Sequence, residues 1–247
     1  MENGFKDCRV DIGILTDDTG SITEIMWDSM IEFIKNLAQF VEISQNGPHI
    51  GLTTYGFNRA EVIIKLNEHT DYHSFEQALD SITRTKTPGN DLALGINVTL
   101  NKLFNVAHGA RNDVPKAIIL LTDGDCDFCL TTEDPATAKK LELLAKKMHK
   151  DKVKMLVIGV GNAGKTATYE DMKFHIEQFV NRSSFHAIED HTGLLDQTLL
   201  KKLTPVCDGM YFVFSPSLKY LNSNFRIYLT SRLKVNRLFF IFRQLIS

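Results

Sequence analysis

The sequence predicts an α/β fold with a doubly wound, mostly parallel six-stranded sheet and one antiparallel edge strand. Short apolar runs rich in β-branched residues alternate with segments of helical periodicity over about 200 residues. Several runs, such as residues 117–121, are apolar throughout, which is typical of strands buried on both faces. Strands of this kind need helices on both sides of the sheet, joined by right-handed crossovers.

The order of the elements follows from where these patterns begin and end. We expect strands at residues 9–15, 50–55, 61–66, 117–121, 155–160 and 185–188. We expect helices at residues 22–41, 74–82, 92–103, 136–149, 169–180 and 194–203. Only a few residues, including Gly56 and Asn58, separate the second strand from the third. This short connection predicts a hairpin and makes the third strand the antiparallel edge.

Charge and composition divide the chain. The 247 residues carry a formal net charge of -2. Residues 1–207 contain 22 Lys/Arg and 29 Asp/Glu, whereas residues 208–247 contain six Lys/Arg, one acidic residue and nine of the 23 aromatic residues. We expect no nucleic-acid partner, because the chain has no global basic field. We also expect no membrane span, because no apolar run approaches about 18 residues.

We therefore expect three parts: an N-terminal extension (1–7), one α/β domain (8–207) and a basic aromatic tail (208–247). The tail is the start of a second domain cut short, a segment that lies on membrane surfaces, or a truncated or non-native end, and we favour the last. Glu2, Asn3 and Gly4 follow Met1, so no signal peptide is visible. The chain is thus either cytosolic or a fragment or mature form without its leader.

Three oxygen-bearing side chains alternate in the loop after the first strand: Asp17, Thr19 and Ser21. Alternation on a tight loop places one carboxylate and two hydroxyls on a common side. Asp123, after the strand at 117–121, supplies a second carboxylate at the edge where doubly wound sheets bind ligands. Oxygen donors with few carboxylates suit Mg²⁺. The alternative is that the first three residues only cap the following helix.

The residues around these positions resemble the von Willebrand factor A domain family of matrilins, collagens and integrin I domains. VDIGILTDDTGSI is similar to the family's opening, which is an apolar strand, then Asp-x-Ser-x-Ser, then a helix. AIILLTDGD is similar to its second metal segment, and VIGVGNA to the loop after its next strand. The resemblance extends over residues 8–207 with the elements in the family's order, and it implies a Rossmann-like A domain.

The resemblance implies a metal-ion-dependent adhesion site formed by Asp17, Thr19, Ser21, Asn90 and Asp123. The segment PGNDLALGINVTL aligns with the family's Gly-rich turn, where Asn90 replaces a threonine and Asp91 adds a neighbouring carboxylate. The implied cation is Mg²⁺, or Ca²⁺ or Mn²⁺. Asp18 stands where the family has a small residue, and we expect its charge to favour Ca²⁺ or to tighten cation binding.

The resemblance further implies a non-enzymatic, extracellular adhesion or ligand-binding module. In the family, the cation keeps an open coordination position that a Glu or Asp of a partner protein fills. Two acidic ligands leave residual positive charge on a divalent cation, which attracts that carboxylate. The expected partner is an extracellular-matrix or cell-surface protein that offers an acidic side chain. An intracellular scaffold with free thiols is a further alternative.

A nucleotide-binding enzyme is the main alternative from another class. Residues Gly159 to Thr166 read GVGNAGKT, which satisfies both the P-loop pattern and the dinucleotide pattern G-x-G-x-x-G. Lys165 would then hold phosphates and Thr166 would contact Mg²⁺. Two points favour a plain strand-to-helix turn. P-loops usually follow the first strand of their domain, and the helical pattern here begins only near Glu170.

The four cysteines form two pairs in the sequence. Cys8 and Cys207 flank the domain, and the resemblance implies a disulfide between them, with two free thiols as the alternative. Cys126 and Cys129 form a CxxC close to Asp123. A lone CxxC supplies only two zinc ligands, so we interpret it as a small disulfide that stiffens a loop at the metal face.

Overall fold

A six-stranded sheet forms the centre of the computed structural model, which describes residues 8–124, 135–161 and 167–202. The strand order is β3-β2-β1-β4-β5-β6, and every pair of neighbours is parallel except β2 and β3. The strands are β1 (Asp11–Asp17), β2 (His49–Gly56), β3 (Arg59–Ile64), β4 (Lys116–Thr122), β5 (Val153–Val160) and β6 (Phe185–Ile188). The predicted fold class is confirmed, including the antiparallel edge strand.

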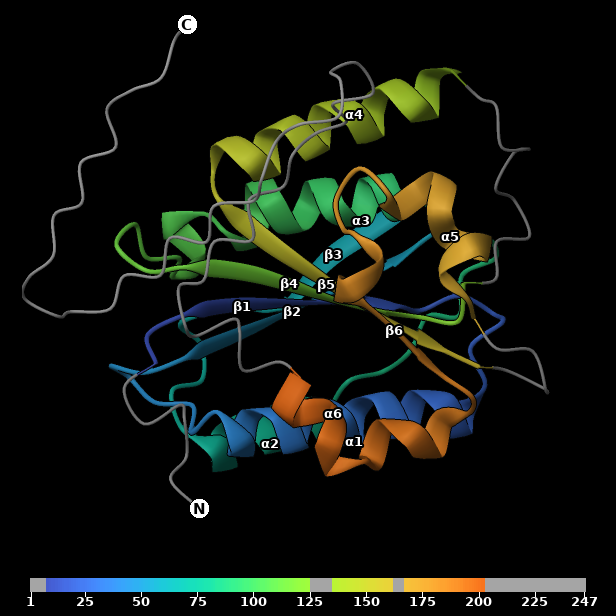
Figure 1. Ribbon diagram of the computed structural model, residues 1–247. Helices are drawn as coiled ribbons and strands as arrows, with labels where there is room; N and C mark the ends of the chain where they lie inside the picture. The colour runs from blue at the N-terminus through green and yellow to red at the C-terminus, as the bar shows by residue number, and fades with distance from the viewer. Residues whose placement is uncertain (1–7, 125–134, 162–166, 203–247) are drawn as a thin grey trace, which may run out of the picture. The chain divides into compact units, whose positions relative to one another are not determined.

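Helices cover both faces of the sheet, as buried strands require (Figure 1). One layer contains α3, α4 and α5, and the other contains α1, α2 and α6. Their bounds are α1 (Glu24–Phe40), α2 (Tyr72–Asp80), α3 (Leu92–Val98), α4 (Pro135–Lys150), α5 (Tyr169–Ile176) and α6 (Gln197–Lys202). The sheet therefore separates two hydrophobic cores, one under each helical layer.

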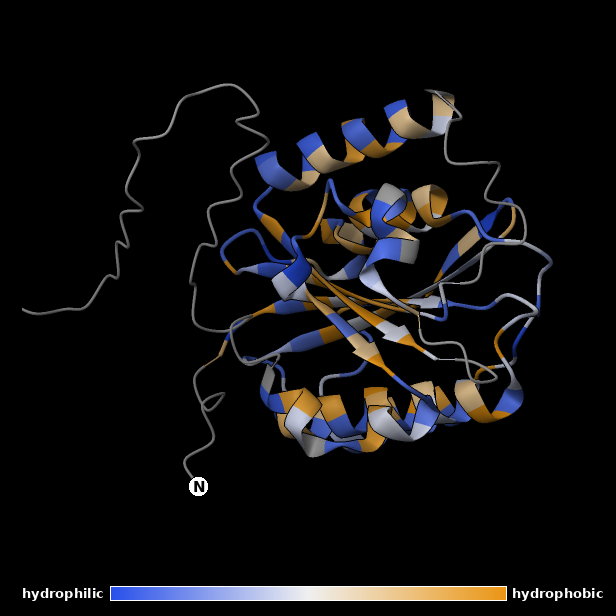
Figure 2. Ribbon diagram, turned by 45° about the vertical axis from the view of Figure 1, so that its right-hand side comes forward, coloured by the Kyte–Doolittle hydropathy of each residue, from blue (hydrophilic) through white to orange (hydrophobic). Residues whose placement is uncertain are grey.

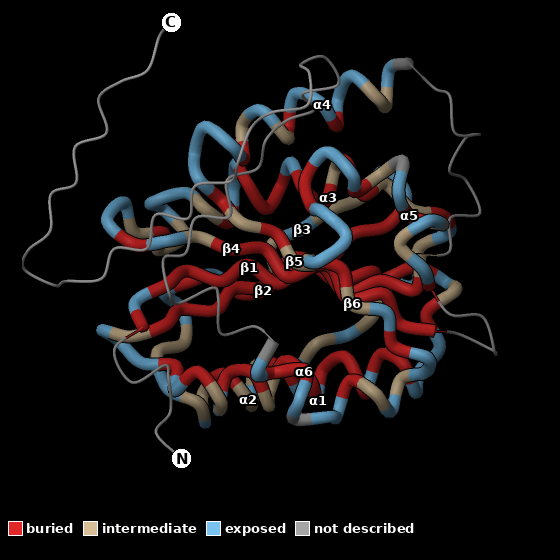
Figure 3. Tube along the Cα trace, in the orientation of Figure 1, coloured by how far each residue is buried: buried red, intermediate tan, exposed pale blue. Residues whose placement is uncertain are grey.

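Burial follows the apolar pattern of the sequence. The strands are apolar along their centres, and the helices present an apolar stripe toward the sheet and a polar one outward (Figure 2). Each residue of β1 and of β2 is buried, and the inner side of α1 is buried along its length (Figure 3). Burial on both faces explains why these strands are nearly continuous apolar runs.

Side-chain caps set the beginnings of three helices. Thr23 accepts the N–H of Met26 at the start of α1, and Asp71 accepts the N–H of Ser74 at the start of α2. Asp91 accepts the N–H of Leu94 at the start of α3. Because Thr23 caps α1, the alternative in which Asp17, Thr19 and Ser21 serve as that helix's cap is wrong.

Two predicted helices differ from the single segments that periodicity indicates. The helix expected at 92–103 is α3 followed by the π-helical turn η1 (Thr99–Leu103), with the Thr99 hydroxyl donating to the carbonyl of Gly95. The helix expected at 194–203 is the 3₁₀ turn η4 (His191–Leu195) followed by α6. Asp196 accepts the N–H of Thr198 between them and restarts the helix.

Several sequence predictions concern residues outside those that the structure describes. The extension at 1–7 and the tail at 208–247 are among them, so the division into three parts stays a prediction. Within the described residues, no helix is both long and apolar enough to cross a membrane.

Two glycines allow η1 to pack closely on the sheet. Gly13 of β1 and Gly51 of β2 are register partners. A Cβ at Gly51 would lie 2.5 Å from Leu103 Cδ1 and 3.0 Å from the carbonyl oxygen of Ile64. Leu103 is fully buried and the Ile64 oxygen is backbone, so neither has room to withdraw.

We predict that Gly51→Ala destabilises the protein by about 1–3 kcal/mol, the usual range for an overpacked core. Gly20→Ala is the matched control, because a Cβ there meets no atom within 4 Å. Urea denaturation of both variants measures the difference. Equal stabilities would contradict the packing argument.

Candidate metal site at the carboxyl edge of the sheet

The strand order determines where a ligand site can form. β2 and β4 lie on opposite sides of β1, so the chain reverses its direction of winding between β1 and β4. Loops that leave two such strands diverge to opposite faces and open a crevice at their carboxyl ends. Asp17 ends β1, and Asp123 directly follows β4. The sequence-predicted residues thus lie where the fold can hold a ligand.

Asp17 is the centre of the site, and its carboxylate is fully buried. Its Oδ1 accepts the N–H of Thr19 at 3.0 Å. Its Oδ2 accepts from Thr122 Oγ1 at 3.0 Å, from Asn90 Nδ2 at 3.3 Å and from the Tyr55 hydroxyl at 3.4 Å. The ends of β1, β2 and β4 and the turn before α3 therefore converge on one carboxylate.

The pKa of Asp17 indicates that no positive charge within the described part of the chain lies close enough to stabilise its ionised carboxylate. Burial, and after it the negative charge of Asp123, raise the pKa of Asp17 from 3.8 to about 7. The groups that lower this pKa are the hydrogen-bond donors Thr19 and Thr122, not cationic side chains. Burial also raises the pKa of Tyr55 well above 10.0, so its hydroxyl keeps its proton. A divalent cation would supply the missing charge.

Two hydroxyls lie beside the carboxylate. Thr19 is buried, Ser21 is half-buried, and Thr19 Oγ1 is 2.9 Å from Ser21 Oγ. Among the residues that the structure describes, no group of three or more His, Cys, Asp or Glu is arranged to hold a metal. A cation at this edge therefore needs the hydroxyls as well as the two carboxylates. This mixed oxygen set fits a hard divalent cation.

The turn before α3 places its two polar residues differently. Asn90 reaches Asp17 through its amide nitrogen. A half-turn of the amide plane exchanges nitrogen for oxygen, so the same side chain can present an acceptor at this point. Asp91 instead caps α3, with its Oδ1 2.9 Å from the N–H of Leu94. The neighbouring carboxylate that the sequence offers is thus engaged in starting the helix.

Two residues that donate hydrogen bonds to Asp17 are not among the site residues predicted from the sequence. Tyr55 lies in β2 and Thr122 ends β4, and both donate to Asp17. Each lies within a residue of a strand's carboxyl end, which is the signal that could have pointed to them. Their hydroxyls hold the orientation of the Asp17 carboxylate.

The expectation that Asp18 adds charge to a bound cation is wrong. Its Oδ1 accepts from Arg84 Nε at 3.3 Å, and its Oδ2 accepts from the N–H and the hydroxyl of Thr85 at 3.0 and 2.6 Å. The same Arg84 side chain donates to the carbonyls of Thr19 and Ile22 and lies 5.1 Å from the Trp27 ring centroid. Asp18 therefore anchors the segment before the Asn90 turn to the loop after β1.

The glycine-rich segment after β5 is explained in part by close packing. Gly161 donates its N–H to the Ile188 carbonyl at 2.8 Å, and a Cβ on it would lie 1.9 Å from the Glu189 oxygen. α5 begins only at Tyr169, three residues beyond Thr166. Lys165 and Thr166 lie outside the described residues. The described glycines fit the predicted strand-to-helix turn.

The cysteine predictions are tested only at Cys8. Cys8 is buried and disulfide-bonded. Cys126, Cys129 and Cys207 lie outside the described residues, so the pairing of Cys8 with Cys207 stays a prediction. Asp125 and Asp127 lie outside them as well.

Sequence comparison decides the family. The profile of the von Willebrand factor type A domain matches residues 11–193. The chain belongs to the von Willebrand factor type A domain family. Collagen alpha-5(VI) chain of Mus musculus is 28% identical over 213 residues, which make up 84% of this chain and 7% of that protein. Integrin alpha-1 of Gallus gallus is 26% identical over 123 residues, 49% of this chain and 42% of that protein. The A domain thus spans less than half of either relative.

Solved structures show the same fold. The proximal thread matrix protein 1 of the mussel byssus, with a zinc-occupied MIDAS motif, matches 81% of this chain and 48% of its own at a TM-score of 0.66 and 20% identity. The manganese-loaded TRAP protein of Plasmodium vivax matches 81% of this chain and 74% of its own at a TM-score of 0.59 and 16% identity. The A-domain architecture is therefore shared across distant sequences.

The raised pKa of Asp17 makes the stability of the metal-free A domain depend on pH. The folded state holds the proton more tightly than the unfolded state, so this group stabilises below about pH 4, and the effect is lost as pH rises through about 7. Asp17→Asn removes the titration. We predict that, in chelator, its stability relative to wild type rises by up to about 4 kcal/mol between pH 4 and pH 8. Urea denaturation at both pH values measures this gain, and a gap that does not change with pH would contradict it.

Arg84 supports a second prediction. Both Arg84 and Asp18 have side chains that are 5% exposed, so Arg84→Gln removes the buried cation beside a buried carboxylate and leaves the more exposed Arg59, whose Nη1 is 3.9 Å from Asp18 Oδ2. We predict a loss of about 3 kcal/mol, partly restored in the Asp18→Asn/Arg84→Gln double variant. The control is Arg9→Gln, which breaks an ion pair whose side chains are 54% and 66% exposed. Denaturation curves of the four proteins form the comparison, and equal losses for the two arginines would refute the anchoring role.

Proposed function

We propose that this A domain is an extracellular adhesion module that binds a partner's carboxylate through a divalent cation. Asp17, Thr19, Ser21, Asn90 and Asp123 would hold the cation. The observation that carries the proposal is the fully buried Asp17 carboxylate, whose pKa is raised to about 7 beside a second buried acid. Such a pair is costly to keep ionised without a cation.

The donor set supports a cation that accepts oxygen ligands. Carboxylate, hydroxyl and amide oxygens are hard donors, and two carboxylates supply no excess of negative charge over that of a divalent cation. Neutral hydroxyls in the remaining positions leave the cation able to attract a further anion. When bound, the cation would act as the acceptor of that anion, and the buried hydrogen bonds to Asp17 would fix the site's orientation. Mg²⁺ is the cation we propose, with Mn²⁺ or Ca²⁺ as substitutes.

The relatives support the location and the kind of partner. They include a collagen chain and an integrin, and one solved neighbour holds zinc and another manganese. We propose an extracellular-matrix or cell-surface protein with an exposed Glu or Asp as the partner. We propose no catalytic step, because the relatives include matrix and adhesion proteins and the described side chains around Asp17 are oxygen donors suited to a cation.

Calorimetry with Mg²⁺ and Mn²⁺ on the full chain tests the site directly. We predict saturable binding to wild type and at least a tenfold loss in Asp17→Asn, because the central carboxylate is removed. The control is Asp28→Asn, which removes the same charge from an exposed position on α1. Equal binding by wild type and Asp17→Asn would rule out the proposed ligands.

A solid-phase assay tests the adhesive role. The protein is applied to a decellularised matrix coat with Mg²⁺ or with chelator, and a Glu-containing peptide competes against its Gln counterpart. We expect binding that chelation abolishes and that only the Glu peptide reduces. Binding that persists in chelator, with the metal site intact by calorimetry, would refute carboxylate capture.

A further inference from the structure

Lysines are concentrated on one helix of this otherwise acidic domain. Seven of the 22 Lys/Arg in residues 1–207 fall within 139–154, where only two acidic residues occur. Five of the seven are on α4, and the other two lie at or just before the start of β5. We call these residues the α4 lysine patch: Lys139, Lys140, Lys146, Lys147, Lys150, Lys152 and Lys154.

Three lysines of the patch lie in a line along one side of α4. Lys139, Lys146 and Lys150 are separated by seven and four residues, so they lie within about 40° of one another around the helix axis and span about 16 Å along it. All three are exposed. The opposite side of α4 is anchored in the core by Leu141 and Leu144. The line is therefore fixed on a rigid element.

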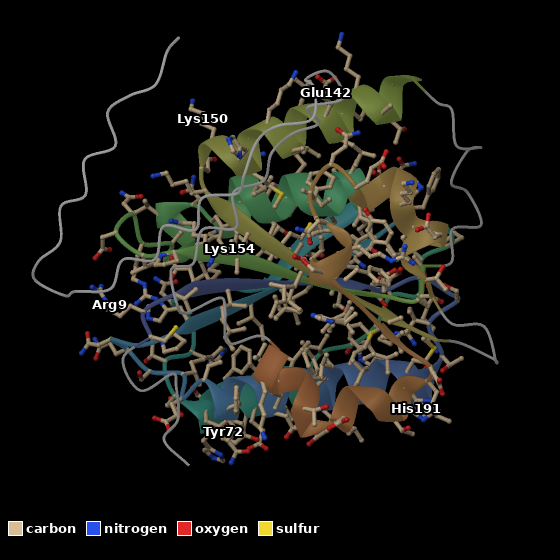
Figure 4. All side chains as sticks on the ribbon, in the orientation of Figure 1. Arg9, Tyr72, Glu142, Lys150, Lys154 and His191 are labelled. Atoms are coloured by element: carbon tan, nitrogen blue, oxygen red, sulfur yellow. The ribbon has the colours of Figure 1, made fainter. Side chains whose placement is uncertain are left out.

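The side chains of the patch are accessible. Figure 4 labels Lys150 at the carboxyl end of α4 and Lys154 below it, near the start of β5. Lys146 is 67% exposed and pairs with Glu142 of the same helix. Exposed pairs of this kind contribute little, so a polyanion can displace them. Within the described ranges, Lys139, Lys140 and Lys150 form no ion pair.

Local helix electrostatics explain only part of the patch. Lys147 and Lys150 lie in the last turn, where cations interact favourably with the helix dipole. Lys139 and Lys140 lie near the other end, where that interaction offers no advantage. The first turn contains no acidic residue that would pair with them. A line of cations that extends from the second turn of α4 to its last residue points to an extended anionic partner.

We propose that the α4 lysine patch binds a linear sulfated polysaccharide. α4 carries no Phe, Tyr or Trp on which bases could stack, and its single imidazole, His149, is a small platform for successive bases, which disfavours single-stranded nucleic acid. Its one exposed large apolar residue, Leu143, is too little to enter a membrane surface. A sulfated chain needs only regularly spaced cations, and it belongs to the extracellular setting of the proposed function, on which the choice of this polyanion rests.

The patch and the metal site are separate. α4 lies on the outer side of one helical layer, and it ends near the amino end of β5, whereas the metal site lies at the carboxyl ends of β1 and β4 (Figure 1). Polysaccharide binding should therefore persist in chelator and in Asp17→Asn. If calorimetry shows no cation binding, heparin binding by the α4 lysine patch can still be observed. If heparin does not bind, the calorimetric test of the metal site is unaffected.

The test compares two triple variants of the full chain on heparin at about 0.15 M salt, in chelator. Lys139→Gln/Lys146→Gln/Lys150→Gln removes the line. Lys65→Gln/Lys102→Gln/Lys173→Gln removes the same charge from exposed lysines elsewhere. We expect the first to weaken binding about tenfold or more and to reduce the salt dependence by two to three ions, and the second to change little. The basic residues of 208–247 are identical in both.

Three outcomes would overturn the proposal. Equal losses in the two triple variants would show binding by general charge. Equal affinity for heparin and for its desulfated form would exclude sulfate as the recognised group. Tighter binding to single-stranded RNA or to anionic phosphatidylserine vesicles would identify a different partner. Circular dichroism confirms that both triples keep their helix content.

Discussion

The structure depends on placing one buried carboxylate at the point where the sheet changes its direction of winding. Asp17 ends β1 with no exposed surface, and the groups around it supply hydrogen bonds rather than positive charge. Ionising such a group costs free energy unless a cation compensates it. The strand order, the turn before α3 and the hydroxyls of Tyr55 and Thr122 all serve to hold this carboxylate in one orientation.

Two adjacent acids show how position decides the role of a residue. Asp17 and Asp18 are both buried, yet Asp18 is neutralised by Arg84 and by donors of the segment that Arg84 begins. This contact ties residues 84–86 to the first loop, and Thr87 then pairs with Thr19. These contacts place the turn that contains Asn90 next to Asp17, to which Asn90 donates a hydrogen bond. One acid builds the site's frame, and the other remains available to a cation.

The parts of the structure that the sequence predicted are those with local signals. Apolar runs located all six strands, and alternating oxygen donors located Asp17, Thr19 and Ser21 at one edge. The first strand extends to Asp17 rather than Leu15, because Thr16 and Asp17 are polar yet buried through tertiary hydrogen bonds to Met30 and Thr122. The role of Asp18 was not predictable, since its partner Arg84 lies 66 residues away. Tyr55 and Thr122 likewise reach Asp17 only after the strands have paired.

The fold limits charge strongly at the carboxyl edge of the sheet and only weakly on the outer side of α4. Loops at the carboxyl edge converge, so acids placed there repel one another and need hydrogen bonds, an arginine or a cation. The outer side of α4 meets no such constraint, because its inner side alone supplies the packing. Lysines can accumulate there without cost to the core. An acidic edge and a basic helix are therefore compatible in one domain, and they favour two kinds of partner: a carboxylate reached through a cation, and a polyanion reached directly.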